Sequence, residues 1–206
     1  MRTDDFLTNR ARAIARLIES GLKYAQVHST GHQEMDMWAD EFPKTISVNG
    51  YRYVFRLMGE NDRAKILSFA NSLSEADLSF MRRDITQPEA VDAWIADVRS
   101  QQAVTILVED GDNLAGYGSL YHNQTYWNRH VAEIRILVSS PYRNHGIGKK
   151  LARELTQLAK ERRLAKVIAY MTVDNLSARR VLEDMGFRPE AILADWVKTR
   201  DERTHD

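Results

Sequence analysis

Cysteine is missing from all 206 residues of the chain. Its absence excludes disulfide bonds, metal sites built on thiolates and nucleophilic catalysis by a cysteine. Long apolar runs are missing as well, because no stretch approaches the ~20 residues that a membrane-spanning helix needs. The N-terminal stretch MRTDDFL carries acidic residues where a signal peptide requires an apolar segment. These absences predict a soluble, cytoplasmic protein that does not enter a membrane.

The chain also lacks a net charge, since 29 Lys and Arg balance 29 Asp and Glu. The charge is nevertheless unevenly spread. Residues 143–180 hold ten basic side chains against three acidic ones, so the rest of the chain carries a deficit of seven. A basic segment on an otherwise acidic chain indicates a local site for a polyanion rather than a general nucleic-acid surface.

The hydrophobic pattern predicts two regions. An amphipathic helix over residues 4–27 and a short helix that ends at Pro43 predict an N-terminal helical extension over residues 1–47. From 48 to 206, strand and helix patterns alternate, which predicts one mixed α/β domain. The predicted strands are 51–57, 104–108, 114–121, 131–138 and 166–172, and the predicted helices are 62–71, one from 74, 86–99, 147–158 and 175–185.

The stretch YRNHGIGKKL, residues 142–151, opens the helix that follows strand 131–138. A helix N-terminus presents unpaired N–H groups and a partial positive charge. Glycines at 146 and 148 let a phosphate reach those groups without meeting a Cβ atom. The stretch matches neither a P-loop nor a dinucleotide fingerprint. It therefore predicts a pyrophosphate site, and the alternative is a tight turn with solvated charges.

Two motifs in this half of the chain resemble those of the GNAT superfamily of N-acyltransferases. The strand VAEIRILVSS and the following PYRNHGIGKKLARELTQLAKE resemble its acetyl-CoA-binding motif, which Arg143, Gly146 and Gly148 match in register. Downstream, VDNLSARRVLEDMGF is similar to the second motif of the family, with matches at Asn175, Ala178, Gly186 and Phe187. The resemblance covers residues 104–190.

This resemblance implies the GNAT fold, in which helices flank a mixed central sheet of about six strands. It implies acetyl-CoA as co-substrate, with its pantetheine arm between two splayed strands, its pyrophosphate on the amides that open the helix, and no metal. Asn175 is expected to hydrogen-bond the arm. The implied coenzyme-binding residues are Leu137, Val138, Ser139, Arg143, Asn144, His145, Gly146, Ile147, Gly148, Lys149, Lys150, Asn175 and Ala178.

Amide formation from a thioester needs a neutral amine, so an alkyl ammonium must first lose a proton to a base. Glu133 matches the position of the glutamate base in many members of the family, and we predict it as the catalytic base. Glu133 shares a strand face with Arg135, so the alternative is an ion pair between them on a solvated sheet face.

The sequence departs from the family at the group that reprotonates the leaving thiolate. Many members carry a tyrosine where this chain has Leu182. Tyr170 and Tyr121 are candidate substitutes, although an aromatic core position fits each of them better. Water is a further proton source, since the coenzyme A thiolate has a modest pKa.

The implied activity is direct transfer of an acetyl group from acetyl-CoA to a primary amine, either a protein lysine or a small molecule. A covalent acyl-enzyme is disfavoured because cysteine is absent and no Ser-His-Asp set is evident. The charge deficit outside the basic segment favours a cationic acceptor. The alternative is a non-catalytic acyl-CoA-binding module that serves as a sensor or scaffold, which the missing tyrosine favours and Glu133 disfavours.

Other candidate sites are weaker. His28 and His32 have a metal-binding spacing on a helix, but no third ligand is evident, so no metal site is predicted. The basic residues between 160 and 166 fit a solvated helix end or a coenzyme phosphate better than nucleic acid.

The C-terminus predicts an incomplete sheet. Residues 190–198, EAILADWVK, read as a strand, whereas TRDERTHD holds no apolar residue and cannot form a buried one. The sheet is therefore predicted to lack its final strand and to leave an unpaired edge. We expect residues 1–47, a second subunit of a homodimer, or a further part of a longer protein to cover that edge.

Overall fold

The computed structural model describes residues 38–79, 81–124, 127–198 and 204–205. The chain divides into two compact units, Met1–Asp40 and Glu41–Asp206, and the fold described below is that of the second unit. The helix predicted over 4–27 and most of the predicted extension lie outside the described residues. The predicted boundary at 48 coincides with the end of the first strand, which already begins at Lys44.

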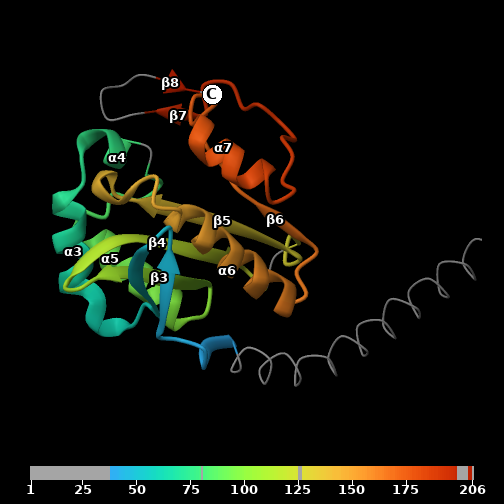
Figure 1. Ribbon diagram of the computed structural model, residues 1–206. Coiled ribbons are helices and arrows are strands. Elements are labelled where there is room, and N and C mark those ends of the chain that lie inside the picture. Colours follow the sequence, from blue (N-terminus) through green and yellow to red (C-terminus); the bar gives the residue numbers. More distant parts are fainter. Residues whose placement is uncertain (1–37, 80, 125–126, 199–203, 206) are drawn as a thin grey trace, which may run out of the picture. The chain divides into compact units, whose positions relative to one another are not determined.

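Six strands form one sheet, in which their spatial order follows their order in the sequence (Figure 1). The strands are antiparallel from the first to the fifth, and the sixth runs parallel to the fifth. This mixed sheet confirms the predicted fold class. The strands are β1 Lys44–Val48, β2 Tyr51–Leu57, β3 Ala103–Asp110, β4 Asn113–His122, β5 Val131–Val138 and β6 Lys166–Ile168.

A two-residue turn joins β1 to β2 in a hairpin that was not predicted from the sequence. Asn49 and Gly50 have φ angles of 49° and 88°, and the flanking residues Val48 and Tyr51 pair directly. Positive φ at both central positions defines a turn that favours Asn-Gly, because its twist matches that of the strands. The Asn-Gly pair was therefore a readable signal for β1.

Three helices lie between β2 and β3, namely α3 Arg63–Ser72, α4 Glu75–Ser79 and α5 Pro88–Arg99, and they follow the 3-10 turn η1 Glu60–Asp62. The predicted helix starts are confirmed. Ser74 Oγ accepts a hydrogen bond from the backbone N–H of Asp77 at 3.1 Å, which caps α4. Pro88 occupies the first position of α5, where its missing N–H costs nothing.

Helices cover both faces of the sheet, and the side chains of β4 point alternately to one face and to the other. Tyr117 packs against Trp94 of α5, with ring centroids 4.7 Å apart. The next residue, Gly118, faces the helix α6 Ile147–Glu161, where an added Cβ would lie 3.1–3.2 Å from the side chains of Leu155 and Leu151. Both leucines are fully buried, and burial of each stabilises the fold by ~1.5–3 kcal/mol.

The C-terminal part differs from the prediction over residues 190–198. Residues 190–196 form no strand, and β7 Val197–Lys198 pairs with β8 Thr204–His205 in a separate two-stranded sheet. The predicted strand is wrong because β6 ends at Ile168, short of the predicted 172, and offers no long edge to extend. Within the described residues the main sheet ends at β6, so it lacks the strand predicted over 190–198 as well as the final strand whose absence was predicted. The helix α7 Leu176–Glu183 packs against α6.

Candidate functional site

The glycine turn, residues 143–148, leads from β5 into α6. The 3-10 turn η2 Ser140–Tyr142 precedes it. Asn144 and Gly146 have φ angles of 64° and 90°, and Gly146 is the N-cap of α6. A Cβ at Gly146 would lie 2.8 Å from Cγ1 of Val48. Both the backbone angle and the close approach of the β1–β2 hairpin therefore require glycine at 146.

Gly148 has a different role, because nothing in the fold requires glycine at this position. A Cβ there would come no closer than 3.9 Å to another side chain, that of Val138. The first intrahelical bond in this turn runs from the N–H of Lys150 to the carbonyl of Gly146 at 3.1 Å. The N–H groups before it are those that a helix leaves without intrahelical partners. Bare backbone at 148 keeps them open to an anion.

His145 fixes the glycine turn to β2. Its ring stacks on Tyr51 with centroids 3.9 Å apart and planes 2° from parallel. The Tyr53 hydroxyl lies 2.6 Å from His145 Nδ1. The turn is therefore held from outside its own segment. The sequence gives no indication of these two contacts, since β2 precedes the turn by some ninety residues.

The predicted cations of the turn all have acidic partners. Lys149 pairs with Asp184 at 3.0 Å and Lys150 with Glu154 at 3.0 Å. The exposed pair of Lys149 is weak and exchanges readily for a stronger anion, whereas Glu154 is buried and also pairs with Lys44 at 2.8 Å. Arg143 donates to Asp77 and, at 3.2 Å, to the carbonyl of Val138. The guanidinium of Arg143 is thus held by α4, and its predicted contact with pyrophosphate stays a prediction.

The strands β5 and β6 pair over three residues only, from Val131 opposite Lys166 to Glu133 opposite Ile168. Beyond that point β5 continues to Val138, whereas β6 ends. The β6 side of β5 from Arg135 onward is therefore unpaired within the described sheet. An extended chain that carries amide groups can hydrogen-bond to such an edge. Leu137 and Val138 lie on this stretch, where the Val138 carbonyl already accepts from Arg143, and their predicted contact with the coenzyme stays a prediction.

Two other predicted positions are already hydrogen-bonded. Ser139, just past β5, donates its hydroxyl to the carbonyl of Ala115 at 3.1 Å. Asn175 is the N-cap of α7, and its Oδ1 accepts from the N–H of Ala178 at 3.2 Å. The Asn175 side chain therefore has a structural role in the helix start, and its NH₂ group remains a donor for another partner.

Glu133 lies at the last pair between β5 and β6, and its side chain is 16% exposed. Arg135 donates to both carboxylate oxygens at 2.8 and 3.2 Å. Arg82, from the loop after α4, donates to Oε2 at 3.0 Å. The ion pair between Glu133 and Arg135, which the sequence suggested as the alternative, is thus present, and Arg82 adds a second guanidinium to it. Both oxygens have guanidinium partners, but Oε1 accepts only the bond from Arg135 and keeps a lone pair that can take a proton.

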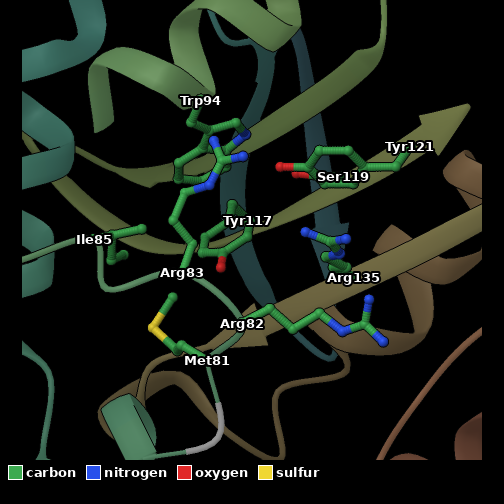
Figure 2. A pocket seen from close by; sticks show the side chains of 9 residues that line it. All are labelled: Met81, Arg82, Arg83, Ile85, Trp94, Tyr117, Ser119, Tyr121 and Arg135. Atoms are coloured by element: carbon green, nitrogen blue, oxygen red, sulfur yellow. The ribbon is translucent and has the colours of Figure 1, made fainter. Parts of the chain in front are cut away.

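A small pocket opens beside Glu133 on the α5 side of the sheet (Figure 2). Arg82 and Arg83 were missed as site residues, because nothing in the sequence shows that the loop after α4 reaches β5. Trp94 comes from α5 and Tyr117 from β4. The residues that line this arginine pocket are Met81, Arg82, Arg83, Ile85, Trp94, Tyr117, Ser119, Tyr121 and Arg135.

Of the two tyrosines considered as proton donors, Tyr170 is largely exposed at this site, whereas Tyr121 lines the pocket and also packs against the buried core, as expected. The ring of Tyr170, which is 49% exposed, lies 4.4 Å from the guanidinium carbon of Arg82. The ring centroid of Tyr121 lies 3.9 Å from the guanidinium carbon of Arg135. Burial raises the pKa of Tyr121 above its usual value. Leu182, at the position of the family tyrosine, is buried.

Metal and membrane sites find no support in the part of the chain that the structure describes. That part holds no group of three or more His, Cys, Asp or Glu side chains placed to bind a metal ion. His28 and His32 lie outside it. No helix among the described residues is both long and apolar enough to cross a bilayer.

The model of the acetyltransferase (GNAT) family matches residues 70–187. The GNAT domain of S. lividans PAT superposes with a TM-score of 0.64 and 16% identity, over 75% of this chain and 92% of that one. Ribosomal-protein-alanine N-acetyltransferase from Brucella melitensis gives 0.64 and 23%, over 73% and 93%. Spermidine N-acetyltransferase from Vibrio cholerae, in complex with CoA and spermine, gives 0.61 and 17%, over 74% and 90%. No curated protein matches the chain significantly.

Proposed function

Because the chain belongs to the acetyltransferase (GNAT) family, we propose that it transfers the acetyl group of acetyl-CoA directly to a primary amine. The observation that carries the proposal is the position of the glycine turn. It opens α6 at the end of the unpaired stretch of β5, with Glu133 at the other end of that stretch. One continuous path thus joins an anion site, an open strand edge and a carboxylate.

In this proposal the glycine turn holds the pyrophosphate. The amides from His145 to Lys150 donate to it, and glycine at 148 permits the close approach. Lys149 leaves its weak, exposed pair with Asp184 to face the phosphates, and Lys150 can follow because Glu154 keeps Lys44 as a partner at 2.8 Å. The pantetheine arm then lies along the open edge of Leu137 and Val138, within reach of the Asn175 amide.

The chemistry needs an amine nitrogen with an available lone pair. That nitrogen attacks the thioester carbonyl carbon, the C–N bond forms, and the C–S bond breaks with release of the coenzyme A thiolate. The nitrogen loses a proton, and we assign its acceptance to Glu133, directly or through water. Oε1 of Glu133 accepts one hydrogen bond, from Arg135, and so has a lone pair left to take this proton. Tyr121, Tyr170 or water supplies the proton that the thiolate takes up.

A second function is favoured by the same ion pairs. If the ion pairs with the two arginines keep Glu133 from taking a proton from the amine, the chain binds acyl-CoA without catalysis and acts as a sensor or scaffold. Leu182 in place of the tyrosine points the same way. The chain is also proposed to act in the cytoplasm, without nucleic acid or membrane as partner.

Turnover separates the two functions. The full chain is incubated with acetyl-CoA and a panel of primary amines, and release of the free thiol is followed together with the mass of the acetylated product. An acetyltransferase releases thiol in proportion to the amine consumed. Tight acetyl-CoA binding by calorimetry with no amine-dependent release supports the binding module instead.

A further inference from the structure

The buried carboxylate of Asp77 holds the start of the glycine turn to α4. Its Oδ1 accepts a hydrogen bond from Nη2 of Arg143, and its Oδ2 accepts one from the Ser140 hydroxyl at 3.1 Å. Ser140 begins η2 and Arg143 begins the glycine turn. One side chain therefore contacts both ends of the segment that leads out of β5. We call the residues Asp77, Ser140 and Arg143 the turn clamp.

The two charges of the turn clamp differ in burial. The Asp77 side chain is 2% exposed, whereas that of Arg143 is 50% exposed. A carboxylate that is removed from water needs a cation and hydrogen bonds in place of its hydration. Among the described residues, Arg143 alone forms an ion pair with Asp77. Loss of that guanidinium leaves a buried charge without its partner, which costs far more than loss of an exposed ion pair.

This difference decides where Arg143 lies when the coenzyme is bound. The glycine turn is at the surface, where Asn144 is exposed. Water and salt weaken the bond between a guanidinium and a phosphate at such a place. The bond to the buried Asp77 is screened much less. The guanidinium therefore gains more from Asp77 than from the phosphates, and it stays with Asp77.

The turn clamp also contacts the strand edge that is proposed for the pantetheine arm. Nε of Arg143 donates to the carbonyl of Val138, the last residue of β5, at 3.2 Å. Arg143 thus joins the end of the open edge to α4 and to the turn at once. The arm and the pyrophosphate of the coenzyme are parts of one molecule, so their two sites need a fixed separation. The turn clamp lies where these sites meet.

We propose that Asp77 is a positioning residue for coenzyme binding. Through Ser140 and Arg143 it holds the glycine turn at the end of β5, and Arg143 keeps this contact when the coenzyme binds. The inference rests on the proposed function, which places the pyrophosphate on the turn. It differs from the contact that the family resemblance implies for Arg143, because the guanidinium acts within the turn clamp and not as a cation that is free for phosphate.

The two roles of Arg143 predict opposite effects of Asp77→Asn. Asparagine keeps the shape of the side chain but loses its charge, so it binds the guanidinium weakly. If Arg143 belongs to the turn clamp, the turn loses its support and acetyl-CoA binds more weakly. If Arg143 leaves Asp77 for the phosphates, the substitution removes a competing negative charge. Acetyl-CoA then binds equally or more tightly.

Calorimetry on the full chain with two ligands measures this effect. Acetyl-CoA reaches the turn, whereas S-acetylpantetheine has the arm but no phosphate. We expect Asp77→Asn to bind acetyl-CoA about tenfold more weakly, which is the effect of one charge-assisted bond. S-acetylpantetheine should bind as to the wild type, whereas a chain that is merely less stable would lose affinity for both ligands. In turnover, the KM for acetyl-CoA should rise while kcat at saturation is retained.

Asp184→Asn is the matched control. Asp184 also pairs with a cation of the turn, Lys149, but its side chain is 63% exposed. Its removal should leave acetyl-CoA affinity equal to that of the wild type or higher, because Lys149 is expected to leave Asp184 for the phosphates. The same substitution thus acts in opposite directions at the buried and at the exposed acid.

Two further variants keep the test decisive. Ser140→Ala removes the other bond to Asp77 from an exposed position, and it serves where Asp77→Asn does not fold. It should weaken acetyl-CoA binding about threefold, the effect of a neutral hydrogen bond. Arg143→Met combined with Asp77→Asn should bind like the weaker single variant, since both changes break one contact. Additive losses would assign Arg143 a separate contact with the coenzyme and overturn the inference.

Hydrogen exchange on the ligand-free chain separates the turn clamp from the proposed function. The backbone N–H groups of Tyr142, Arg143 and Lys150 are hydrogen-bonded within the segment, and they should exchange faster in Asp77→Asn than in Asp184→Asn. Equal exchange overturns the inference, as does equal or tighter acetyl-CoA binding by Asp77→Asn, and neither result touches the proposed function. A wild-type chain that binds no acetyl-CoA refutes the proposed function, and the exchange rates still decide whether Asp77 orders the turn.

Discussion

The Tyr53 hydroxyl lies 2.6 Å from Nδ1 of His145, although the two residues are 92 positions apart in the chain. One belongs to β2 and the other to the glycine turn. Together with the stacking of Tyr51 on the same ring, this contact sets the position of the turn before any ligand arrives. A binding loop that is ordered in advance loses less entropy when its ligand binds.

The first prediction concerns this contact. Tyr53→Phe keeps the ring and removes the hydroxyl, so the turn loses one hydrogen bond of about 1 kcal/mol. We expect acetyl-CoA to bind about fivefold more weakly, which calorimetry measures. Tyr142→Phe is the control, because Tyr142 meets His145 only edge-on at 6.5 Å. Equal affinity of Tyr53→Phe and wild type would mean that the stacking alone holds the turn.

The two glycines of the turn should respond differently to substitution. Gly146→Ala meets both a left-handed backbone and Val48, so we expect the free energy of unfolding to fall by about 1–3 kcal/mol. Gly148→Glu has no such conflict in the fold and should unfold like the wild type. It places bulk and negative charge on the proposed pyrophosphate site, so acetyl-CoA binding should be lost.

Denaturant titration and calorimetry on both variants check this pair. Gly148→Ala serves as the matched control for the fold, since alanine fits there and favours a helix over glycine by roughly 0.5–1 kcal/mol. Unchanged acetyl-CoA affinity in Gly148→Glu would refute the site assignment.

These glycines also show what the sequence could reveal. The motif around Arg143 and Gly146 predicted the turn, the long helix and their place after β5, because the backbone conformation of a turn depends mainly on the residues within it. Asn49 and Gly50 carried an equally local signal for the β1 hairpin, which the sequence analysis did not use. The contact of Arg82 with Glu133 could not be predicted, since it joins a loop to a strand 51 residues away. The strand expected over 190–198 failed because its partner β6 is short.

The third prediction tests the base. Glu133→Gln keeps the shape of the side chain, so acetyl-CoA should bind as before. The rate at neutral pH should fall by about 10²-fold or more, because a positioned base contributes that much. As pH rises and the amine itself loses its proton, part of the rate should return. A pH–rate profile identical to that of the wild type would assign the proton to another group or to water.

A fourth prediction concerns the pH dependence of stability at the other end of the sheet. Arg56 of β2 donates to Asp62 at 2.6 and 2.8 Å and pairs with Glu109 at 2.8 Å. Burial alone would raise the pKa of Asp62, but the bonds from Arg56 and from the Gly59 N–H outweigh it and hold the pKa below its usual value. The pKa of Glu109 is lowered in the same way.

A carboxylate whose pKa is lower in the folded state stabilises the fold above its unfolded pKa, near 4. That contribution is lost as pH falls through the lower folded value. We therefore expect the free energy of unfolding to drop below about pH 4. Arg56→Met should cost about 2–4 kcal/mol at neutral pH, because Asp62 loses its ion-pair partner and Glu109 keeps only Lys65, and it should flatten the acid dependence. Urea titrations at a series of pH values measure both effects.

The last prediction concerns the edge of the sheet at β6. Within the described residues nothing pairs with the outer side of β6, and the segment after α7 leaves Ile192 and Trp196 72% and 63% exposed. Unpaired strand edges and large apolar side chains together are typical of interfaces, since a bare edge invites association.

We expect a second copy of the chain to cover this region, in a homodimer. The double substitution Ile192→Ser with Trp196→Ser removes apolar area and leaves the main sheet unaltered, because neither residue belongs to it. Light scattering should then give about half the mass per particle of the wild type, with the thermal unfolding of the monomer preserved. A wild-type chain that is already monomeric would exclude the second copy and would leave residues 1–37 as the expected cover, since residues 44–47 of the predicted extension belong to β1 at the opposite edge. Removal of residues 1–37 should in that case cause aggregation, which the same serine substitutions should suppress because they take away the apolar surface that drives it.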